Sequence, residues 1–422
     1  MIMRKLSTAK EVLFSRGIGD VFKLLAKNIK LYSLRASRFA VSRLWNAVRI
    51  LTRNNDKKNG IINVLYIADR LETENGLTIR YRIFNLREAL GTGMHTKFEI
   101  IENGIYKHAC SIAWADIIVL MRLEWSPMVE TVVKTAKRND IPVVYDIDDI
   151  IFRQDYSEKF CSILSDGTQN DTDKYKNIFL RQSQTYSHSD YATTSTQYIA
   201  DIMKSDGKRA YVIHNGLNDK QIKISHDLCD DNKTTERYIG YLSGSATHNK
   251  DFSQAAPALA RILKEYNDVK LRIIGYLELS DLEACFPGRI ETMDFMKWDK
   301  LLRVSAANFI NIAPLDIDNP FCHAKSELKY FESAIVRVPT VASATETYKQ
   351  CIVNGINGLL ASNDDEWYLS VKALLDDNEL YKSISNHAYT NAIEHYAPKA
   401  IANEVVLCYQ SIINDYKSNR IK

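Results

Sequence analysis

The chain lacks the cysteine patterns that mark disulfide-rich and zinc-binding proteins. Its 422 residues include seven scattered cysteines, an odd number, and none of them forms a C-x-x-C pair. This scatter argues against a disulfide framework and a structural zinc site, and it favours a reducing, cytosolic setting. Long apolar runs are also missing from residues 1–60, where a Lys or Arg interrupts the sequence every few positions. That segment is therefore too polar to span a bilayer, and it lacks the apolar region of a secretory signal.

Charge is distributed unevenly along the chain, although the overall net charge is only +3. Residues 1–60 contain fourteen Lys/Arg and three Asp/Glu, a net of +11, which leaves a net of −8 on the remaining 362 residues. The sequence thus predicts a basic N-terminal arm on an acidic body. Because the basic charge is confined to the arm, we do not expect nucleic-acid binding.

The arm, residues 1–60, carries the pattern of an amphipathic basic helix. Apolar and basic residues recur in it at helical spacing: Phe22, Leu25, Ile29 and Tyr32 beside Lys23, Lys27 and Lys30. One interpretation is a helix on an anionic membrane surface, where each basic residue contributes about 1 kcal/mol. The other is a solvated helix, or a segment that docks on a partner protein.

Beyond the arm, strand-like and helix-like patterns alternate, which is typical of doubly wound α/β domains, and the length favours two of them. Residues 61–225 contain six strand candidates, at 61–69, 97–101, 115–122, 141–148, 191–196 and 210–216. A polar stretch at 226–237 predicts a linker, and the alternation restarts over residues 236–395. A helix over residues 396–422 could pack back against the first half. We expect two Rossmann-like domains facing a cleft, with ligands beyond the carboxyl ends of the strands.

The segment NPFCHAKSELKYFESAIVRVPTVAS, residues 319–343, carries the most chemical information. If KSELKYFESAI is one helix, Lys325, Lys329 and Glu332 lie on one face near its start. A helix N-terminus offers unpaired N–H groups and partial positive charge to a phosphate, and the lysines add full charge. Glu332 could accept hydrogen bonds from two ribose hydroxyls, so the site suits a nucleoside diphosphate. The alternative is a solvated helix with a Lys–Glu pair.

A second candidate is GYLSGSATHNKDF, residues 240–252, in which a strand is followed by a Gly/Ser loop and a helix. Gly244 and Ser245 would let the backbone approach a phosphate closely, while His248 and Lys250 could supply charge. The segment matches neither G-x-G-x-x-G nor the P-loop, and a plain tight turn is the alternative.

Taken in order, the sequence segments resemble a known family. They are RYRIFNLREAL, VVYDIDDIIF, VIHNGLN, GYLSGSATHNKDF, AKSELKYFE, VPTVAS and NGINGLLAS. Together they resemble the nucleotide-sugar glycosyltransferases of GT-B fold, family four, and above all the bacterial enzymes that build O-antigen lipopolysaccharide, capsule and other surface glycans. The resemblance implies retaining transfer of a sugar from a nucleoside diphosphate to a hydroxyl of a lipid-linked or growing glycan. It requires no metal or other cofactor, and it implies a cytoplasmic enzyme at the inner face of the membrane, with residues 1–60 as the contact.

The resemblance also assigns roles to individual residues. Glu332 would bind the donor ribose, but the first Glu of the family's Glu-x7-Glu pattern is Ala324 here, and Lys325 with Ser326 would take its place. Tyr241 stands where many relatives have a diphosphate-binding Arg, so Lys250 and Lys329 are the expected substitutes. The expected catalytic set is Lys329, Lys250 and Glu332, and the expected donor-binding set is Gly244, Ser245, His248, Asn319, Lys325 and Ser326. No protein base is expected, because in such families the departing phosphate is thought to take the acceptor's proton.

The stretch IPVVYDIDDIIF, residues 141–152, ends a strand candidate with Asp146, Asp148 and Asp149. Such carboxylates could hold a divalent metal, act as a phosphatase nucleophile or bind sugar hydroxyls. The metal arrangement belongs to enzymes with one nucleotide-binding domain, and phosphatase aspartates follow the first strand of their domain. We therefore expect no metal site, and a cleft wall on the acceptor side formed by Arg80, Arg82, Asp146 and Asp148. There the aspartates would bond to sugar hydroxyls or pair with the arginines, and Asp149 would cap a following helix.

Two other functions remain compatible with the sequence. Ala324 and Tyr241 suggest a catalytically silent relative that binds a sugar or a partner protein. The Asp146–Asp149 cluster suggests a metal-dependent enzyme.

Overall fold

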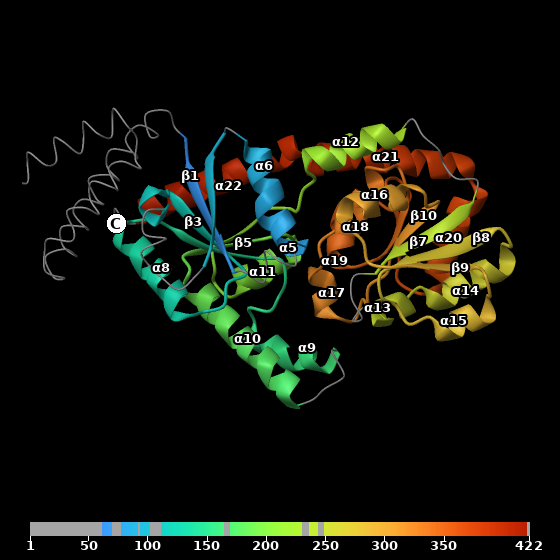
Figure 1. The fold of residues 1–422 in the computed structure, drawn as a ribbon, viewed down its shortest axis with the longest axis horizontal. Helices are drawn as coiled ribbons and strands as arrows, with labels where there is room; N and C mark the ends of the chain where they lie inside the picture. The colour runs from blue at the N-terminus through green and yellow to red at the C-terminus, as the bar shows by residue number, and fades with distance from the viewer. Residues whose placement is uncertain are drawn as a thin grey trace, which may run out of the picture. The chain divides into compact units, whose positions relative to one another are not determined.

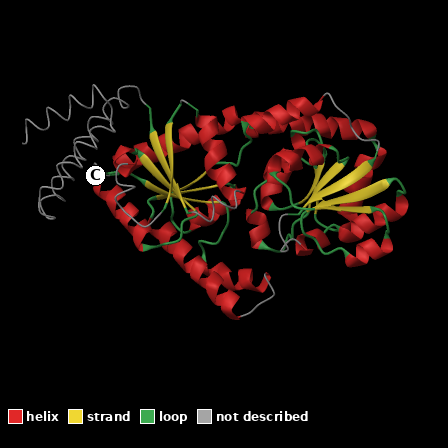
Figure 2. Ribbon diagram, in the orientation of Figure 1, coloured by secondary structure: helices red, strands yellow, loops and turns green. Residues whose placement is uncertain are grey.

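The computed structural model describes residues 61–69, 77–91, 93–101, 111–163, 169–229, 236–243 and 249–419. These residues form two parallel six-stranded sheets, one after the other along the chain, with helices packed around each (Figures 1 and 2). The predicted fold class, α/β with two Rossmann-like doubly wound halves, is confirmed. The predicted basic arm, residues 1–60, lies outside the described residues.

The first sheet has the strand order β2-β1-β3-β4-β5-β6, and every pair is parallel. Its strands are β1 (Asn63–Ala68), β2 (His95–Ile100), β3 (Ile117–Met121), β4 (Val143–Ile147), β5 (Tyr191–Thr194) and β6 (Ala210–Val212). All side chains of β1, β3 and β4 are buried, as expected for strands covered on both faces. The chain leaves β1 towards β2 and then returns to β3 on its other side. The switch point between β1 and β3 is where such sheets bind ligands.

The described residues of this half form nine helical segments. They are α5 (Leu77–Ile79), η1 (Arg80–Phe84), α6 (Asn85–Leu90), α8 (Pro127–Arg138), η2 (Gln154–Tyr156), α9 (Ser157–Ile163), α10 (Gln169–His188), α11 (Gln197–Ser205) and α12 (Asp219–Cys229). The segments α5, η1 and α6 follow one another directly, and η1 is a π-helical turn. π-turns inside helices are frequent at functional sites. The end of α12 shows that the linker predicted from residue 226 begins too early, because the helix continues to Cys229.

The second sheet has the order β12-β11-β10-β7-β8-β9 and is also parallel throughout. Its strands are β7 (Arg237–Leu242), β8 (Val269–Ile274), β9 (Ile290–Met293), β10 (Ile310–Ala313), β11 (Thr340–Ser343) and β12 (Leu359–Ala361). Its switch point lies between β7 and β10. The sequence patterns did not reveal β9, because this edge strand is four residues long and has no fully buried side chain.

Ten helices surround this sheet or follow it. They are α13 (Asn249–Ser253), α14 (Ala256–Glu265), α15 (Ser280–Cys285), α16 (Trp298–Ala306), α17 (Pro320–Ala324), α18 (Leu328–Ala334), α19 (Glu346–Cys351), α20 (Asp364–Asp376), α21 (Asn378–Tyr396) and α22 (Pro398–Ser418). The last helix, α22, lies beside the first sheet next to α6 (Figure 1). Its residues Ile401, Val405 and Ile412 join the apolar core of that sheet, and the hydroxyls of Tyr409 and Tyr66 are 3.1 Å apart. Among the described residues, no helix is both long and apolar enough to cross a membrane.

Candidate functional site

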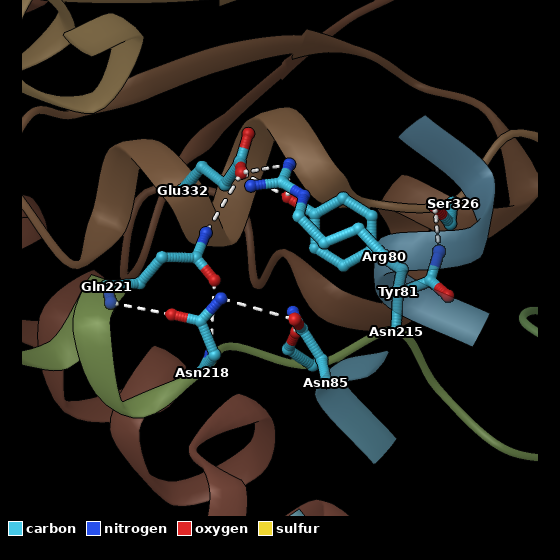
Figure 3. Close-up of polar contacts among 9 residues, drawn as sticks. Arg80, Tyr81, Asn85, Asn215, Asn218, Gln221, Ser326 and Glu332 are labelled. Carbon is cyan, nitrogen blue, oxygen red and sulfur yellow. Dashed lines mark hydrogen bonds and ion pairs between the residues drawn. The ribbon is translucent and has the colours of Figure 1, made fainter. Parts of the chain in front are cut away.

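Glu332, on α18 of the second half, contacts three residues of the first half (Figure 3). Its Oε1 accepts hydrogen bonds from Gln221 Nε2 at 3.1 Å, from Arg80 Nη2 at 3.5 Å and from the Tyr81 hydroxyl. The Glu332 side chain is 16% exposed. Burial, together with the nearby Glu332 carboxylate, raises the pKa of Tyr81 well above its ordinary value, so the phenol remains a donor. All three protein bonds go to Oε1, and Oε2 takes part in none of them.

Arg80 lies at this carboxylate with two of its donors unused. Its guanidinium stacks on the rings of Tyr81 and Trp298, with centroid distances of 4.3 and 4.9 Å, and Nη2 donates to the Tyr81 hydroxyl at 2.6 Å. Nε and Nη1 are buried and have no hydrogen-bond partner in the described part of the chain. Buried unpaired donors are rare and costly in native proteins, and a ligand is one way to satisfy them. The structure therefore places Arg80 beside Glu332, not beside the aspartates with which it was grouped.

The predicted single helix over KSELKYFESAI is wrong. Helix α17 ends at Ala324, Lys325 is extended (φ −60°, ψ 132°), and α18 begins only at Leu328. The short α17 has its own N-terminal cap, where Pro320 is the first helical residue and Asn319 Oδ1 accepts from Phe321 N–H at 3.0 Å. Lys325, Lys329 and Glu332 are therefore not on one face of one helix. Asn319, expected to bind the donor, is buried, and its side-chain oxygen caps α17.

Lys329 lies near the ring of Tyr241 and near a second cation, Lys325. Its Nζ lies 6.0 Å from the centroid of the Tyr241 ring, and no carboxylate among the described residues forms an ion pair with it. Burial lowers the pKa of Lys329, the charge of Asp251 opposes that shift, and the charge of Lys325 adds to it. An ammonium group that is partly desolvated and lies near a second cation is stabilised by a bound anion.

Lys250, at the start of the second sheet's first helix, has a different environment. Its Nζ forms an ion pair of 2.8 Å with Asp316 Oδ2, and the two side chains are 65% and 5% exposed. Next to it, buried Asp251 accepts hydrogen bonds from Asp316 N–H at 3.1 Å and from Cys322 Sγ at 3.3 Å. These contacts join the segments that follow β7 and β10, at the switch point of the second sheet.

The remaining donor-side candidates differ in what the structure shows of them. Ser326 Oγ accepts a hydrogen bond from Asn215 Nδ2 at 2.9 Å, so it joins the two halves (Figure 3). Gly244, Ser245 and His248 lie outside the described residues. Ala324 is 1% exposed and belongs to an apolar cluster built mainly from the first half. A carboxylate at this position would be buried among apolar side chains.

On the acceptor side, the structure corrects the roles predicted for Arg82 and Asp146. Both are buried, at 0% and 2% exposure, and they form a bidentate ion pair. Of the two roles considered for Asp146, pairing with an arginine is the one observed, and neither side chain is exposed to an acceptor. Asp148 is partly exposed and lies 3.5 Å from Arg122 Nη1.

The expected helix cap at Asp149 is also wrong, because its Oδ1 accepts from Ile150 N–H at 2.8 Å and no helix starts there. In the part of the chain that the structure describes, no three His, Cys, Asp or Glu residues are grouped to hold a metal ion.

Several residues of the site were not recognised in the sequence: Tyr81, Asn215, Gln221, Trp298 and Asp316. Asn215 lies in VIHNGLN just after β6, and Asp316 follows β10, so their positions beyond strand ends could have marked them. Tyr81, Gln221 and Trp298 carry no such signal, because their importance arises only where the two halves meet.

The sequence of the second half is similar to a known protein family. Residues 236–377 match the family model "Glycosyl transferases group 1". The match covers the segment from β7 to α20, including Lys329 and Glu332, and it confirms the predicted enzyme class, a glycosyltransferase. No curated protein is similar enough in sequence to count as a match.

Several solved structures are similar in fold to most of this chain. HepE from Anabaena, solved with UDP, is 13% identical, with coverage of 83% of this chain and 100% of that one and a TM-score of 0.56. Sucrose-phosphate synthase from Thermosynechococcus elongatus is 10% identical (84% and 100% coverage, TM-score 0.57). A glycosyltransferase from Rickettsia africae is 12% identical (84% and 99% coverage, TM-score 0.55). At these identities the similarity concerns the fold, and it identifies the two halves as a GT-B arrangement.

Proposed function

We propose that this protein is a retaining glycosyltransferase that moves a sugar from a nucleoside-diphosphate sugar to a hydroxyl of a lipid-linked or growing bacterial surface glycan, such as O-antigen or capsule. The observation that carries the proposal is Lys329, a partly buried ammonium group that forms no ion pair with the described residues, one turn before Glu332 in a matched glycosyltransferase domain. The proposal assigns the diphosphate to Lys329 and the ribose to Glu332. The UDP bound to HepE is consistent with this class of donor.

The chemistry requires positive charge at the leaving group. Cleavage of the bond between sugar and diphosphate builds negative charge on the phosphate oxygens, and preorganised donors that meet this charge supply the largest catalytic term. Helix α18 has only seven residues, so its dipole is a weak source. We therefore assign the charge to Lys329 and Lys325, with Lys250 in support. The ion pair with Asp316 partly neutralises the positive charge of Lys250.

The proton of the acceptor hydroxyl needs a destination. In the proposed retaining reaction, the acceptor oxygen forms a bond to the anomeric carbon on the face that the diphosphate leaves. The departing phosphate oxygen takes the hydroxyl proton, so the products are the glycoside and the protonated nucleoside diphosphate. This route assigns no proton transfer to Glu332, whose Oε1 already accepts three protein hydrogen bonds.

The test is donor hydrolysis and transfer with a panel of sugar nucleotides. Lys329→Met is expected to lower kcat/KM by about 100- to 1,000-fold, the usual cost of removing one donor to a developing anion. Glu332→Ala is expected to weaken donor binding. Lys382→Met is the matched control, because Lys382 is 56% exposed on α21, away from this site. Wild-type rates in both site variants would overturn the donor-site assignment.

The membrane part of the proposal rests on the basic arm, residues 1–60. A triple variant with Lys23, Lys27 and Lys30 replaced by Glu is expected to lose co-sedimentation with anionic vesicles. Equal binding of wild type and variant to these vesicles would count against a membrane contact through the arm.

A further inference from the structure

A pocket of about 400 Å³ lies between the two halves, separate from the Lys329 region. Its volume is within the usual range of small-ligand sites, roughly 300–1,000 Å³. The side chains that line it come from α9, α11 and α17 and the segments just before α9 and α17: Tyr156, Tyr198, His323, Asp155, Asp318 and Lys159. None of these residues was assigned a role above.

Aromatic rings form one part of the lining. Tyr198 and His323 lie against each other with ring centroids 5.6 Å apart, and Tyr156 meets the ring of Phe321 edge-on at 6.0 Å. Both tyrosines are partly exposed, so apolar ring surface and hydroxyl groups are available together. Such amphipathic rings suit a ligand that has both C–H faces and hydroxyl groups.

His323 is held as a neutral ring. Its Nδ1 accepts from Glu346 N–H at 3.1 Å, and so its Nε2 carries the proton that is donated to Ile317 O at 2.8 Å. Both ring nitrogens are thus engaged, and the residue offers ring surface to the pocket instead of a charge. The imidazole therefore provides no positive charge that would bind an anion in the pocket.

The charged side chains that line the pocket also favour an uncharged ligand over an anion. Asp318 is exposed, and Lys159 Nζ donates to the Asp318 backbone carbonyl at 3.3 Å. Asp155 forms an ion pair of 2.7 Å with Arg153. Two carboxylates and one ammonium group provide acceptors for hydroxyls but no cluster of cations for a phosphate.

The pocket is next to the proposed donor site along the chain. Asp318 N–H bonds to Asp316 Oδ1 at 3.1 Å, and Asp316 is the partner of Lys250. At the other end of α17, His323 lies two residues before Lys325. Helix α17 has five residues, and an α-helix rises about 1.5 Å per residue. The distance from a ligand in the pocket to Lys250 and Lys325 is therefore about the length of this short helix.

We propose that this pocket binds an uncharged sugar unit of the acceptor glycan. The inference rests on the proposed function, because it takes the acceptor to be a glycan, and it replaces the buried Arg82 and Asp146 as the acceptor-side contact. The aromatic rings would cover the C–H face of the sugar, and Asp318 would accept a hydrogen bond from a hydroxyl.

The experiment uses saturation-transfer NMR on the full chain with four neutral disaccharides: maltose, cellobiose, lactose and chitobiose. At least one is expected to receive saturation, and Tyr198→Ala is expected to weaken its binding at least tenfold. Asp318→Asn, at an exposed residue where folding is not at risk, is expected to weaken it several-fold. Tyr276→Ala is the control, since Tyr276 is 54% exposed and lines no part of the pocket.

The outcomes separate this proposal from the proposed function. No saturation of any disaccharide, equal binding by Asp318→Asn and wild type, or stronger binding of galacturonic acid than of the neutral sugars would overturn the pocket assignment. Binding of sugar nucleotides, measured separately by calorimetry, tests the donor site without reference to the pocket. If the chain binds a disaccharide but no sugar nucleotide, the pocket assignment stands and the proposed transferase function is overturned.

Discussion

Arg82 and Asp146 form a buried bidentate ion pair that joins the π-turn η1 to strand β4. Arg82 Nε and Nη2 donate to the two carboxylate oxygens at 3.0 and 2.6 Å. Thr193 adds a hydroxyl hydrogen bond to Asp146 at 2.7 Å, and Arg82 Nη1 reaches Asn215 Oδ1 at 3.2 Å. The pair therefore fixes the turn whose first two residues, Arg80 and Tyr81, contact Glu332 in the second half.

Asp146→Ala is expected to lower the free energy of unfolding by about 3–5 kcal/mol, because it leaves the Arg82 guanidinium buried without its counter-ion. Urea denaturation measures the loss. Asp155→Ala removes one of the two carboxylate partners of Arg153 at the surface, where a loss of less than about 1 kcal/mol is expected. An Asp146 variant of full stability, with only a raised KM for the acceptor, would restore the role predicted from the sequence.

Arg80→Met is expected to weaken UDP-sugar binding by roughly tenfold or more, because it removes two buried donors that have no protein partner. Arg80→Lys keeps the charge but not the planar fork, and it should restore little of the affinity. Calorimetry measures the UDP-sugar affinity of both variants. If both bind the donor like wild type, Arg80 serves only the contact between the halves.

The fold could be predicted from the sequence because buried parallel strands leave a strong local signal. Strands β1, β3 and β4 are continuous apolar runs, and each was found within two residues of its ends. The weakly buried β9 was missed for the same reason. Strand detection thus depended on burial on both faces, which is a property of the sheet interior.

The site was less predictable, because contacts between the halves decide it. A local pattern placed Lys325 on one helix with Glu332, yet α17 ends at Ala324 and Lys325 has extended backbone. A short pattern also cannot tell that Asp146 is buried against Arg82, 64 residues away. The roles predicted for the charged residues depend on their partners, and those partners are set by the tertiary structure.

Glu327→Gln is expected to change how stability depends on pH. Glu327 is 2% exposed, and among the described residues its Oε2 has no hydrogen-bond partner. Burial raises the pKa of Glu327 above its ordinary 4.5, although nearby His214 opposes the shift. The protonated carboxyl thus contributes stability that is complete below pH 4.5 and is lost as the pH rises through the folded-state pKa.

The stability of Glu327→Gln relative to wild type should therefore increase above pH 4.5, with a slope of at most about 1.4 kcal/mol per pH unit. Urea denaturation of both proteins from pH 4 to 8 measures it. Glu158→Gln, at a side chain that is 83% exposed, is the control and should show no such trend. Parallel pH profiles for Glu327→Gln and wild type would contradict the prediction.

Gly275→Ala is expected to disturb the donor side of the second sheet. Gly275 follows β8 with φ of +100°, and a Cβ there would collide with the backbone oxygen of Ser243, the residue after β7. The backbone cannot move freely, because Gly275 N–H bonds to Met293 O and Ser243 N–H bonds to Ile274 O, at 2.9 and 2.8 Å. The variant therefore combines a left-handed backbone, which costs about 1–2 kcal/mol, with a clash at Ser243, which precedes Gly244 and Ser245 in the sequence.

Gly207→Ala separates the two effects. Gly207 also has a positive φ, +78°, but a Cβ there meets nothing within 4 Å, so only the backbone term remains. Gly275→Ala should lose more unfolding free energy than Gly207→Ala in urea, and only Gly275→Ala should weaken UDP binding in calorimetry. Equal losses of stability in the two variants would show that the backbone at Ser243 moves away from the new Cβ without a loss of unfolding free energy. Unchanged UDP binding by Gly275→Ala would separate this strand end from the donor site.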